Sequence, residues 1–429
     1  MPNTVFTSLS PNLEKDDTVR ARKALFSPWT WQKGKAIQRF EQEFKDYLKV
    51  KNVTSFESGR TALYTILQAL NIQKGDEVLL QAYTCVAVPE PVLWVGATPI
   101  YVDCEPERYT LSISKLEKKI TPQSKALIIQ HTFGNPARMN ELLKIAKKHN
   151  LFVIEDCAHA LGTNYFKKKV GTFGDASFFS FGRDKAISSV FGGMAVAKNK
   201  ELQEKIAQIQ ASYPYPTKIW ILRQLLHPLL TNLAKKTYAS GFGKLILYFN
   251  NHLRITSKAV YPEEKKGGKP SFIGHKFPNA LAILAHAQLT KINRFNTHRQ
   301  NLAKLYDQEL KSNAKVTRQK LIPGSIYLRY TIQVKNRDQL MRRAKYKGLL
   351  LGNWYDTPIA PAGVNYTDIR YARDCETAES LAKTTINLPT DINTTKLQAK
   401  QISTFINHET KSVLLEKIAA ETKKAAQKN

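Results

Sequence analysis

The feature of this sequence that most limits its fold is a regular alternation of short apolar runs and helical patterns over residues 50–200. Helical patterns such as TALYTILQALN and MNELLKIAKKHN lie between several of the apolar runs. Apolar strands separated by helices are typical of a mostly parallel sheet with helices on both faces. The sequence therefore predicts an α/β fold, with strands at Glu77–Gln81, Pro99–Val102, Ala126–Gln130, Phe152–Ile154 and Ser177–Phe181.

The last part of the chain has a different pattern. A long helical stretch, LTKINRFNTHRQNLAKLYDQEL, leads into a strand candidate, SIYLRYTIQV, and then into RDQLMRRAKYKG, a helix that ends at a glycine. AESLAKTTINLPT and KLQAKQISTFINHE add another helix, a strand edge and a final helix. We therefore expect a large domain at residues 1–289 and a smaller α+β domain at residues 290–429.

Residues 214–270 resemble an insertion in the large domain. IWILRQLLHPLLTNLA and FGKLILYFNNHL are apolar and have lysines around them. Polar residues and a proline interrupt the first segment, so neither has the roughly 20 unbroken apolar residues that a membrane span needs. The pattern predicts a helical hairpin that packs on the protein itself or on a second subunit. The alternative is a basic amphipathic element, at about residues 214–255, that contacts a membrane surface.

Charge and cysteine usage limit the class of protein. A net charge of +30 attracts nucleic acid, anionic lipid or phosphorylated small molecules. Lysines are spread along the whole chain and no RRM, KH or zinc-finger pattern occurs, so we expect no specific nucleic-acid partner. The four cysteines lack CxxC or metal-type spacing, which favours free thiols in a reducing cytoplasm and no metal site. The N-terminus lacks an apolar signal core, and we expect a cytoplasmic protein, with contact at the inner membrane face as the alternative.

A lysine follows the last apolar run in SFFSFGRDKAISSVFGGMAV, residues 177–196. Burial of Lys185 would disfavour its charged form, and a neutral amine is the nucleophile that a Schiff base requires. Ser180, five residues earlier, can donate its hydroxyl to a phosphate. The alternative is that Lys185 caps a strand and points to solvent.

An acid and a histidine follow another apolar run in VIEDCAHALGT, residues 153–163. A pyridine ring drains electrons from a carbanion only while an anion keeps its nitrogen protonated, and Asp156 suits that task. His159 can hydrogen-bond or stack on the same ring. An Asp-x-x-His pair also caps helices or binds metals, but no further metal ligands accompany it.

A small turn precedes a helix in SFESGRTALYTIL, residues 55–67. Ser58 and Gly59 would leave backbone N–H groups free at the positive end of the helix dipole, where phosphate binds readily. Arg60 lies in the first turn and can reach the same anion. An N-cap would explain the serine equally well.

These motifs, together with GDEVLLQAYTCVAVPEPVLWVGATPIYVDCEP and QHTFGNP, resemble the DegT/StrS-type sugar aminotransferases of the aspartate-aminotransferase fold group. The resemblance implies pyridoxal 5'-phosphate as cofactor and fold type I, with a seven-stranded type of sheet in the large domain. It also implies that Lys185 carries the cofactor and moves the proton, that Asp156 pairs with the ring nitrogen, and that His159 lies near the phenolic oxygen. Gly59, in the turn after Ser58, would hold the phosphate together with Ser180.

The chain departs from the family pattern at three positions. Arg60 replaces a threonine of the phosphate turn and would bind the phosphate. Cys85 stands where an aromatic residue often stacks on the cofactor ring, with Tyr83 two residues away. Gly274 replaces an asparagine that reaches across the dimer, whereas Lys276 matches the basic position of that pattern.

The resemblance implies a homodimeric aminotransferase that moves an amino group from glutamate to a nucleotide-linked keto-sugar. A relative that removes a sugar hydroxyl carries histidine at the lysine position, so Lys185 favours transamination over dehydration. One alternative is a pyridoxal-phosphate enzyme that acts on a cyclitol, or on a lipid-linked sugar at a membrane surface. Another is a non-catalytic regulator that retains the fold.

Overall fold

The computed structural model describes residues 4–410, and its largest element is a seven-stranded sheet. Strand β11 is antiparallel to both neighbours, whereas β10, β7, β6, β3 and β5 pair in parallel. This arrangement confirms the predicted α/β fold with a mostly parallel sheet. In spatial order the strands are β2 (Val53–Phe56), β11 (Gly193–Ala197), β10 (Ala176–Ser180), β7 (Phe152–Asp156), β6 (Ser124–Gln130), β3 (Glu77–Gln81) and β5 (Thr98–Val102).

The sheet is buried on both faces. On β6, Ala126 and Ile128 belong to one hydrophobic core, whereas Leu127 and Ile129 belong to another, because successive residues of a strand point to opposite faces. One core is completed by helices α3 (Gly59–Ala69), α4 (Pro89–Trp94) and α7 (Lys200–Ser212). The opposite face packs against α2 (Lys35–Leu48), α5 (Ile113–Leu116), α6 (Met139–Lys148) and α10 (Asn279–Leu289). Continuous apolar strands therefore occur where both faces are covered.

A second, smaller sheet lies in the C-terminal part. Its antiparallel strands have the order β12 (Thr317–Arg318), β13 (Tyr330–Gln333) and β16 (Thr385–Leu388). Around it lie α11 (Ile292–Glu309), α12 (Arg337–Tyr346) and α13 (Glu376–Thr384), and residues 396–410 are helical. These elements occupy the positions that the sequence patterns indicated. The boundary at residue 289 stays a prediction, and the end of the predicted small domain lies outside the described residues.

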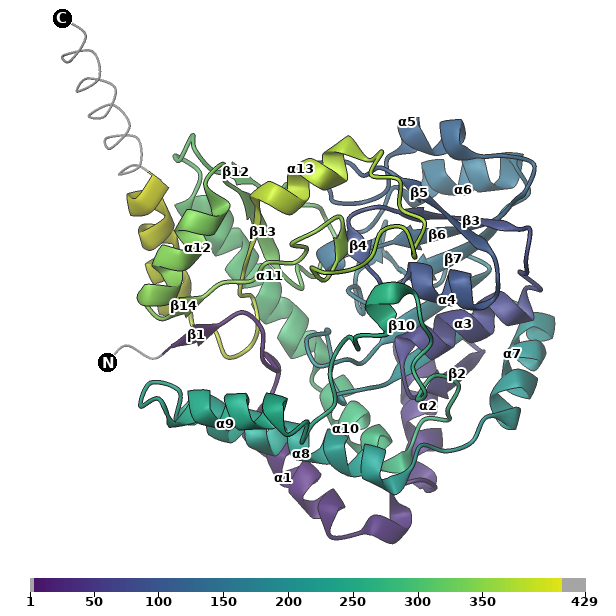
Figure 1. Ribbon diagram of the computed structural model, residues 1–429, viewed down its shortest axis with the longest axis horizontal. Coiled ribbons are helices and arrows are strands. Elements are labelled where there is room, and N and C mark those ends of the chain that lie inside the picture. Colours follow the sequence, from purple (N-terminus) through teal and green to yellow (C-terminus); the bar gives the residue numbers. More distant parts are fainter. Residues whose placement is uncertain (1–3, 411–429) are drawn as a thin grey trace, which may run out of the picture.

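The N-terminal segment belongs to this C-terminal part, which the sequence did not indicate. Strand β1 (Val5–Phe6) pairs in parallel with β14 (Leu349–Leu350), and Val5 packs in the same core as the three-stranded sheet (Figure 1). The remaining short strands are β4 (Thr84–Cys85) with β15 (Ile359–Ala360), and β8 (Asn164–Tyr165) with β9 (Lys168–Lys169).

The apolar segment near residues 214–255 forms two helices, α8 (Lys218–Lys236) and α9 (Phe242–His252), which contact each other. Helix α8 packs against α1 (Lys15–Leu25) and α10, with Ile221 and Leu225 buried. Within residues 4–410, no helix combines the length and apolar character that crossing a bilayer requires.

A buried arginine of α11 links the C-terminal part and the N-terminal segment to the loop that carries the candidate lysine. Arg299 of α11 is 1% exposed and donates to Oδ1 of Asn12 (2.7 Å), the carbonyl of Ala186 (2.8 Å) and Oδ1 of Asn296 (2.6 Å). Burial lowers the pKa of Arg299 to about 9. Asn12 in turn donates to the carbonyl of Lys185 at 2.6 Å. The backbone of the lysine loop is therefore fixed by a residue more than a hundred positions away.

Replacing Arg299 by methionine keeps much of its volume but removes these hydrogen bonds. We expect the free energy of unfolding to fall by about 3 kcal/mol, because buried acceptors lose their donors. Urea unfolding followed by circular dichroism measures this loss. The control is Lys304→Met at an exposed position of the same helix, where we expect a change within about 0.5 kcal/mol. Equal losses in the two variants would contradict the role of Arg299.

Candidate active site

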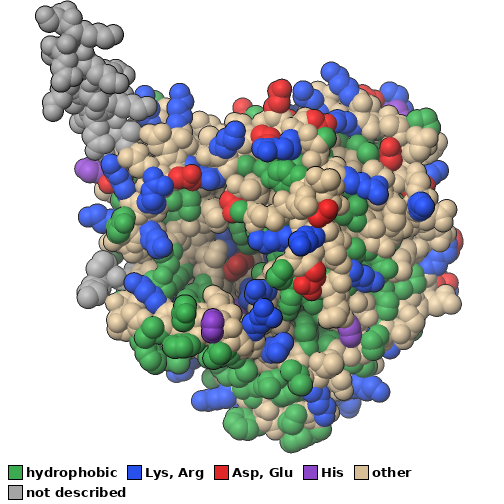
Figure 2. All heavy atoms as spheres, in the orientation of Figure 1, with side chains coloured by type: hydrophobic (Ala, Val, Ile, Leu, Met, Phe, Trp, Pro, Cys, Tyr) green, Lys and Arg blue, Asp and Glu red, His purple; other side chains and the backbone are tan. Residues whose placement is uncertain are grey.

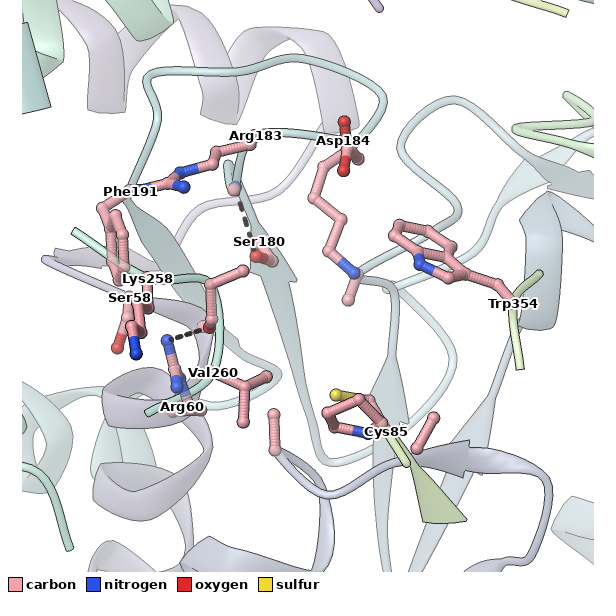
Figure 3. A pocket seen from close by; sticks show the side chains of 18 of the residues that line it. Ser58, Arg60, Cys85, Ser180, Arg183, Asp184, Phe191, Lys258, Val260 and Trp354 are labelled. Carbon is pink, nitrogen blue, oxygen red and sulfur yellow. Dashed lines mark hydrogen bonds between the residues drawn. The ribbon is translucent and has the colours of Figure 1, made fainter. Parts of the chain in front are cut away.

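A cavity of about 780 Å³ opens where β2, β7 and β10 have their carboxyl ends. Polar side chains after parallel strands meet at this edge of a sheet, so residues distant in sequence come together there. Figure 3 shows Arg60, Arg183 and Lys258 on one side of the cavity and Trp354 on the other. All eight predicted site residues line the cavity: Ser58, Gly59, Arg60, Cys85, Asp156, His159, Ser180 and Lys185.

Lys185 lies in the loop between β10 and β11, and its side chain faces the cavity. Its Nζ lies 5.3 Å from the centre of the Trp354 ring. Exclusion of water lowers the pKa of Lys185, while the neighbouring Cys85 and Asp156 act in the opposite direction. The amine is therefore closer to its neutral, nucleophilic form than a lysine in water.

Asp156 is the last residue of β7 and is 3% exposed. Burial raises its pKa, whereas the N–H of Ala158, which donates to Oδ1 at 2.9 Å, and the charge of Lys185 lower it. A buried carboxylate of this kind gains from a cationic or N–H partner. Asp156 is therefore suited to bind a protonated ring nitrogen.

His159 belongs to a stack of aromatic rings. Its imidazole lies 5.3 Å from the Trp354 ring with an interplanar angle of 7°, and 5.9 Å from Phe133 with an angle of 14°. The N–H of Phe133 donates to Nδ1 at 3.3 Å, and Nε2 lies 3.5 Å from the hydroxyl of Tyr355. Burial lowers the pKa of His159 well below its usual value, with Lys185 acting in the same direction. Because Nδ1 accepts a hydrogen bond, the neutral tautomer that fits this geometry carries its hydrogen on Nε2.

The turn before α3 packs closely against neighbouring strands. Ser58 is the N-cap of α3, and its Oγ accepts from the N–H of Thr61 at 3.2 Å. A Cβ on Gly59 would lie 3.0 Å from Cβ of Ser180. A Cβ on Gly193 would lie 2.3 Å from the carbonyl oxygen of Ser58. Glycine at both positions therefore lets the helix N-terminus and the Ser180 hydroxyl share one end of the cavity.

Arg60 reaches the cavity, but its guanidinium already has a partner. It forms an ion pair with Glu264, whose side chain is fully buried, and donates to the carbonyl of Ala259 at 3.3 Å. The guanidinium also lies over the Phe272 ring, 5.0 Å from its centre. Its predicted contact with phosphate stays a prediction.

Cys85 lies on β4 at the cavity wall, and burial raises the pKa of its thiol. Tyr83, the aromatic residue nearby, is fully buried and packs against Tyr109 and Tyr355 instead of lining the cavity. Lys276 lies over the Tyr215 ring, 5.6 Å from its centre, and is not among the described residues that line the cavity.

The sequence reasoning missed two groups of lining residues. Trp354 and Tyr355 come from a loop of the C-terminal part. In the sequence they are only a pair of adjacent aromatic residues, and their position relative to the other motifs does not connect them with the site. Arg254 and Lys258 come from the end of the insertion, and Arg183 donates to the carbonyl of Ser257 there. Figure 2 shows Lys and Arg side chains gathered around the hollow. This wall of the cavity is therefore basic.

The model of the DegT/DnrJ/EryC1/StrS aminotransferase family matches residues 11–213 and 251–407. Residues 214–250, between the two matched segments, contain α8 and most of α9. Residues 214–250 are thus an addition to the family pattern, whereas residues 251–270 of the predicted insertion belong to the matched part.

Individual proteins are also similar to this chain. GDP-perosamine synthase of Escherichia coli O157:H7 is 41% identical over 195 residues, which are 46% of this chain and 54% of that protein. The chain spans about half the length of the curated relatives it matches.

Two solved structures show the same fold. The structure of DesI in the presence of its TDP-sugar product has a TM-score of 0.74 at 19% identity, over 99% of this chain and 96% of that chain. The structure of NtdA from Bacillus subtilis with bound cofactor PMP has a TM-score of 0.72 at 20% identity, over 96% and 86%. The fold and the family match confirm the predicted family. This chain belongs to the DegT/DnrJ/EryC1/StrS aminotransferase family.

Proposed function

We propose that this protein is a pyridoxal-phosphate-dependent aminotransferase that transfers an amino group to a sugar. The observation that carries the proposal is the meeting of Lys185, Asp156 and the Ser58–Gly59 turn in one cavity. These groups match the three demands of the cofactor: an amine for its aldehyde, an anion for its ring nitrogen and N–H donors for its phosphate. The NtdA structure holds PMP, the aminated form of this cofactor, in the same fold.

The residues of the cavity fit pyridoxal phosphate. At one end, the absence of side chains on Gly59 and Gly193 keeps the N-terminus of α3 close to the Ser180 hydroxyl, as a phosphate site requires. Asp156, at the end of β7, would accept a hydrogen bond from a protonated ring nitrogen. When bound, the cofactor supplies an electron-poor ring that stabilises negative charge on the α-carbon of the amino donor.

The chain's own residues then perform the proton transfer. With the cofactor bound, Lys185, with its lowered pKa, would take the proton from the α-carbon of the donor on Nζ and pass it to the cofactor carbon that receives the amine; with the acceptor it would run the same transfer in reverse. Asp156 would keep the ring nitrogen protonated. His159 would offer Nε2–H to an oxygen of the bound cofactor, in place of the Tyr355 hydroxyl that lies 3.5 Å from Nε2. The stacked rings of Trp354 and His159 exclude water from the side of the cavity on which His159 lies.

The acceptor we propose is a keto-sugar linked to a nucleotide, and the donor is glutamate. The relative from Escherichia coli is a GDP-perosamine synthase, and DesI was solved with a TDP-sugar product. The basic wall formed by Arg183, Arg254 and Lys258 supports a diphosphate-bearing acceptor, because it attracts the two negative charges. We further propose a cytoplasmic homodimer, as the family resemblance implies.

Replacing Lys185 by alanine removes the amine that we propose carries the cofactor. The wild type should absorb at roughly 400–430 nm after loading with pyridoxal phosphate, and borohydride should fix the cofactor on Lys185. In Lys185→Ala we expect this band and the fixed label to vanish, and turnover with glutamate and a panel of nucleotide keto-sugars to fall more than about a thousandfold. Lys198→Ala, at an exposed position, should behave like the wild type. A labelled Lys185→Ala chain would disprove the assignment.

Asp156→Asn tests the anion. Asparagine keeps the shape but does not hold a proton on the ring nitrogen, so we expect turnover to fall at least about a hundredfold. Borohydride should still fix the cofactor on Lys185, because the amine is untouched. Stopped-flow measurement of the half-reaction with glutamate separates the two effects. Wild-type rates in Asp156→Asn would argue against this role.

The ion pair of Arg60 with Glu264 joins the phosphate turn to the end of the insertion. Because both partners are buried, removal of either should lower the free energy of unfolding by about 3 kcal/mol. Arg60→Thr restores the residue usual in the family, and Glu264→Gln keeps the shape. We expect the double variant to lose clearly less than the sum of the single losses, since neither partner of this pair is left as an unpaired charge. Urea unfolding of the four proteins measures this coupling, and strictly additive losses would contradict it.

A further inference from the structure

Helix α9 exposes a stripe of large apolar side chains. Phe242, Leu245, Phe249 and Leu253 are each 51–64% exposed. Their spacing of three, four and four residues places them on one side of the helix. Figure 1 shows α9 at the lower left edge of the molecule, and Figure 2 shows apolar side chains gathered over the same region. Contiguous exposed apolar surface of this kind marks a place where something else binds.

The family fold does not explain this stripe. The family model matches the chain on both sides of residues 214–250 but not within them. Helix α8 gives the hairpin its attachment, because α8 packs on α1 and α10. Helix α9 contacts α8, and no other part of residues 4–410 covers its outer side. The hairpin is therefore an added element whose apolar side faces outward.

The segment that carries the stripe has charged side chains of one sign only. From residue 205 to residue 262 the sequence contains no Asp or Glu. The same stretch contains Lys205, Lys218, Arg223, Lys235, Lys236, Lys244, Arg254 and Lys258. Lys236 is the last residue of α8, Lys244 lies in the first turn of α9 two residues after Phe242, and both are exposed. An apolar and aromatic helix side in a segment that has lysines and no acids is the pattern of a helix that lies in the interface of an anionic bilayer.

We propose that the outer side of α9 docks this protein on an anionic lipid surface. Phe242, Phe249 and their apolar neighbours enter the boundary between head groups and acyl chains, and Lys236 and Lys244 contact the lipid phosphates. A second copy of the chain fits this face less well. A symmetric contact would bring the same lysines of two copies together.

Docking would also bring the cavity to the lipid surface. Asn250, Asn251 and Arg254, at the end of α9, line the cavity, while Phe249 and Leu253 belong to the exposed stripe. One helix thus joins the candidate active site and the proposed membrane contact. Binding to vesicles needs no turnover, so the docking proposal stands or fails independently of the proposed aminotransferase activity.

The first test is co-sedimentation of the full chain with vesicles of phosphatidylcholine, alone or mixed with phosphatidylglycerol. We expect binding that increases with the anionic fraction and weakens with salt. This measurement needs only the wild type. Binding that does not depend on the anionic fraction, or no binding at all, would overturn the proposal.

The second test uses matched variants. Phe242→Ser with Phe249→Ser should lower the vesicle partition coefficient by about tenfold or more, because the two aromatic rings that would be buried in the lipid are removed. Phe26→Ser with Phe166→Ser removes two phenylalanines that are 75% and 81% exposed elsewhere, and should leave binding unchanged. Equal binding by the two double variants would disprove the role of α9.

The third test isolates the lysines. Lys236→Glu with Lys244→Glu should abolish most binding to anionic vesicles. The control, Lys125→Glu with Lys311→Glu, makes the same change in net charge at exposed positions elsewhere and should keep most of the binding. Light scattering after gel filtration monitors the mass of every variant. If the phenylalanine variant loses a subunit and keeps its vesicle binding, the stripe is an interface between copies and the proposal is wrong.

Discussion

The partial burial of the Lys185 amine beside Asp156 is the constraint on which the rest of the site depends. Burial favours the neutral amine, while Asp156 favours the charged one, and the balance leaves the pKa of Lys185 lowered. Burial alone raises the pKa of Asp156, and the nearby lysine opposes that shift. Each group thus stabilises the charge of the other in a cavity that would otherwise disfavour both. A cationic ring nitrogen beside Asp156 would stabilise the carboxylate in place of the Lys185 ammonium.

The fold supplies the closeness that this balance needs. Asp156 ends β7 and Ser180 ends the adjacent β10, so the parallel register of these two strands brings their following loops together. Gly193 on β11 lets the Ser58 turn approach the same edge. Arg299 then fixes the backbone of the lysine loop through Asn12 and the carbonyl of Ala186. The site is therefore assembled by the sheet and held by a polar network from the C-terminal part.

Local sequence was sufficient for the groups that follow strands and insufficient for those that arrive from elsewhere. The apolar runs located the strands, so the residues after them, such as Asp156 and Lys185, were found. Trp354 lines the cavity from a loop almost two hundred residues after Asp156. The periodicity of apolar residues contains no information on such distant contacts. The ion pair of Arg60 with the buried Glu264 was not predicted, because Glu264 lies on a distant segment. The pairing of β1 with β14 escaped for the same reason.

The insertion contributes polar residues to the cavity at its C-terminal end and exposes apolar residues on the outer side of α9. Its C-terminal end contributes Arg254 and Lys258 to the basic wall and Glu264 to the pair with Arg60. Its helix α9 turns apolar residues outward. Arg254, which lines the cavity, directly follows the exposed Leu253, so the apolar stripe and the cavity wall are neighbours in the chain. Contact of α9 with lipid would therefore hold the wall that we propose binds the acceptor's phosphates close to the membrane surface.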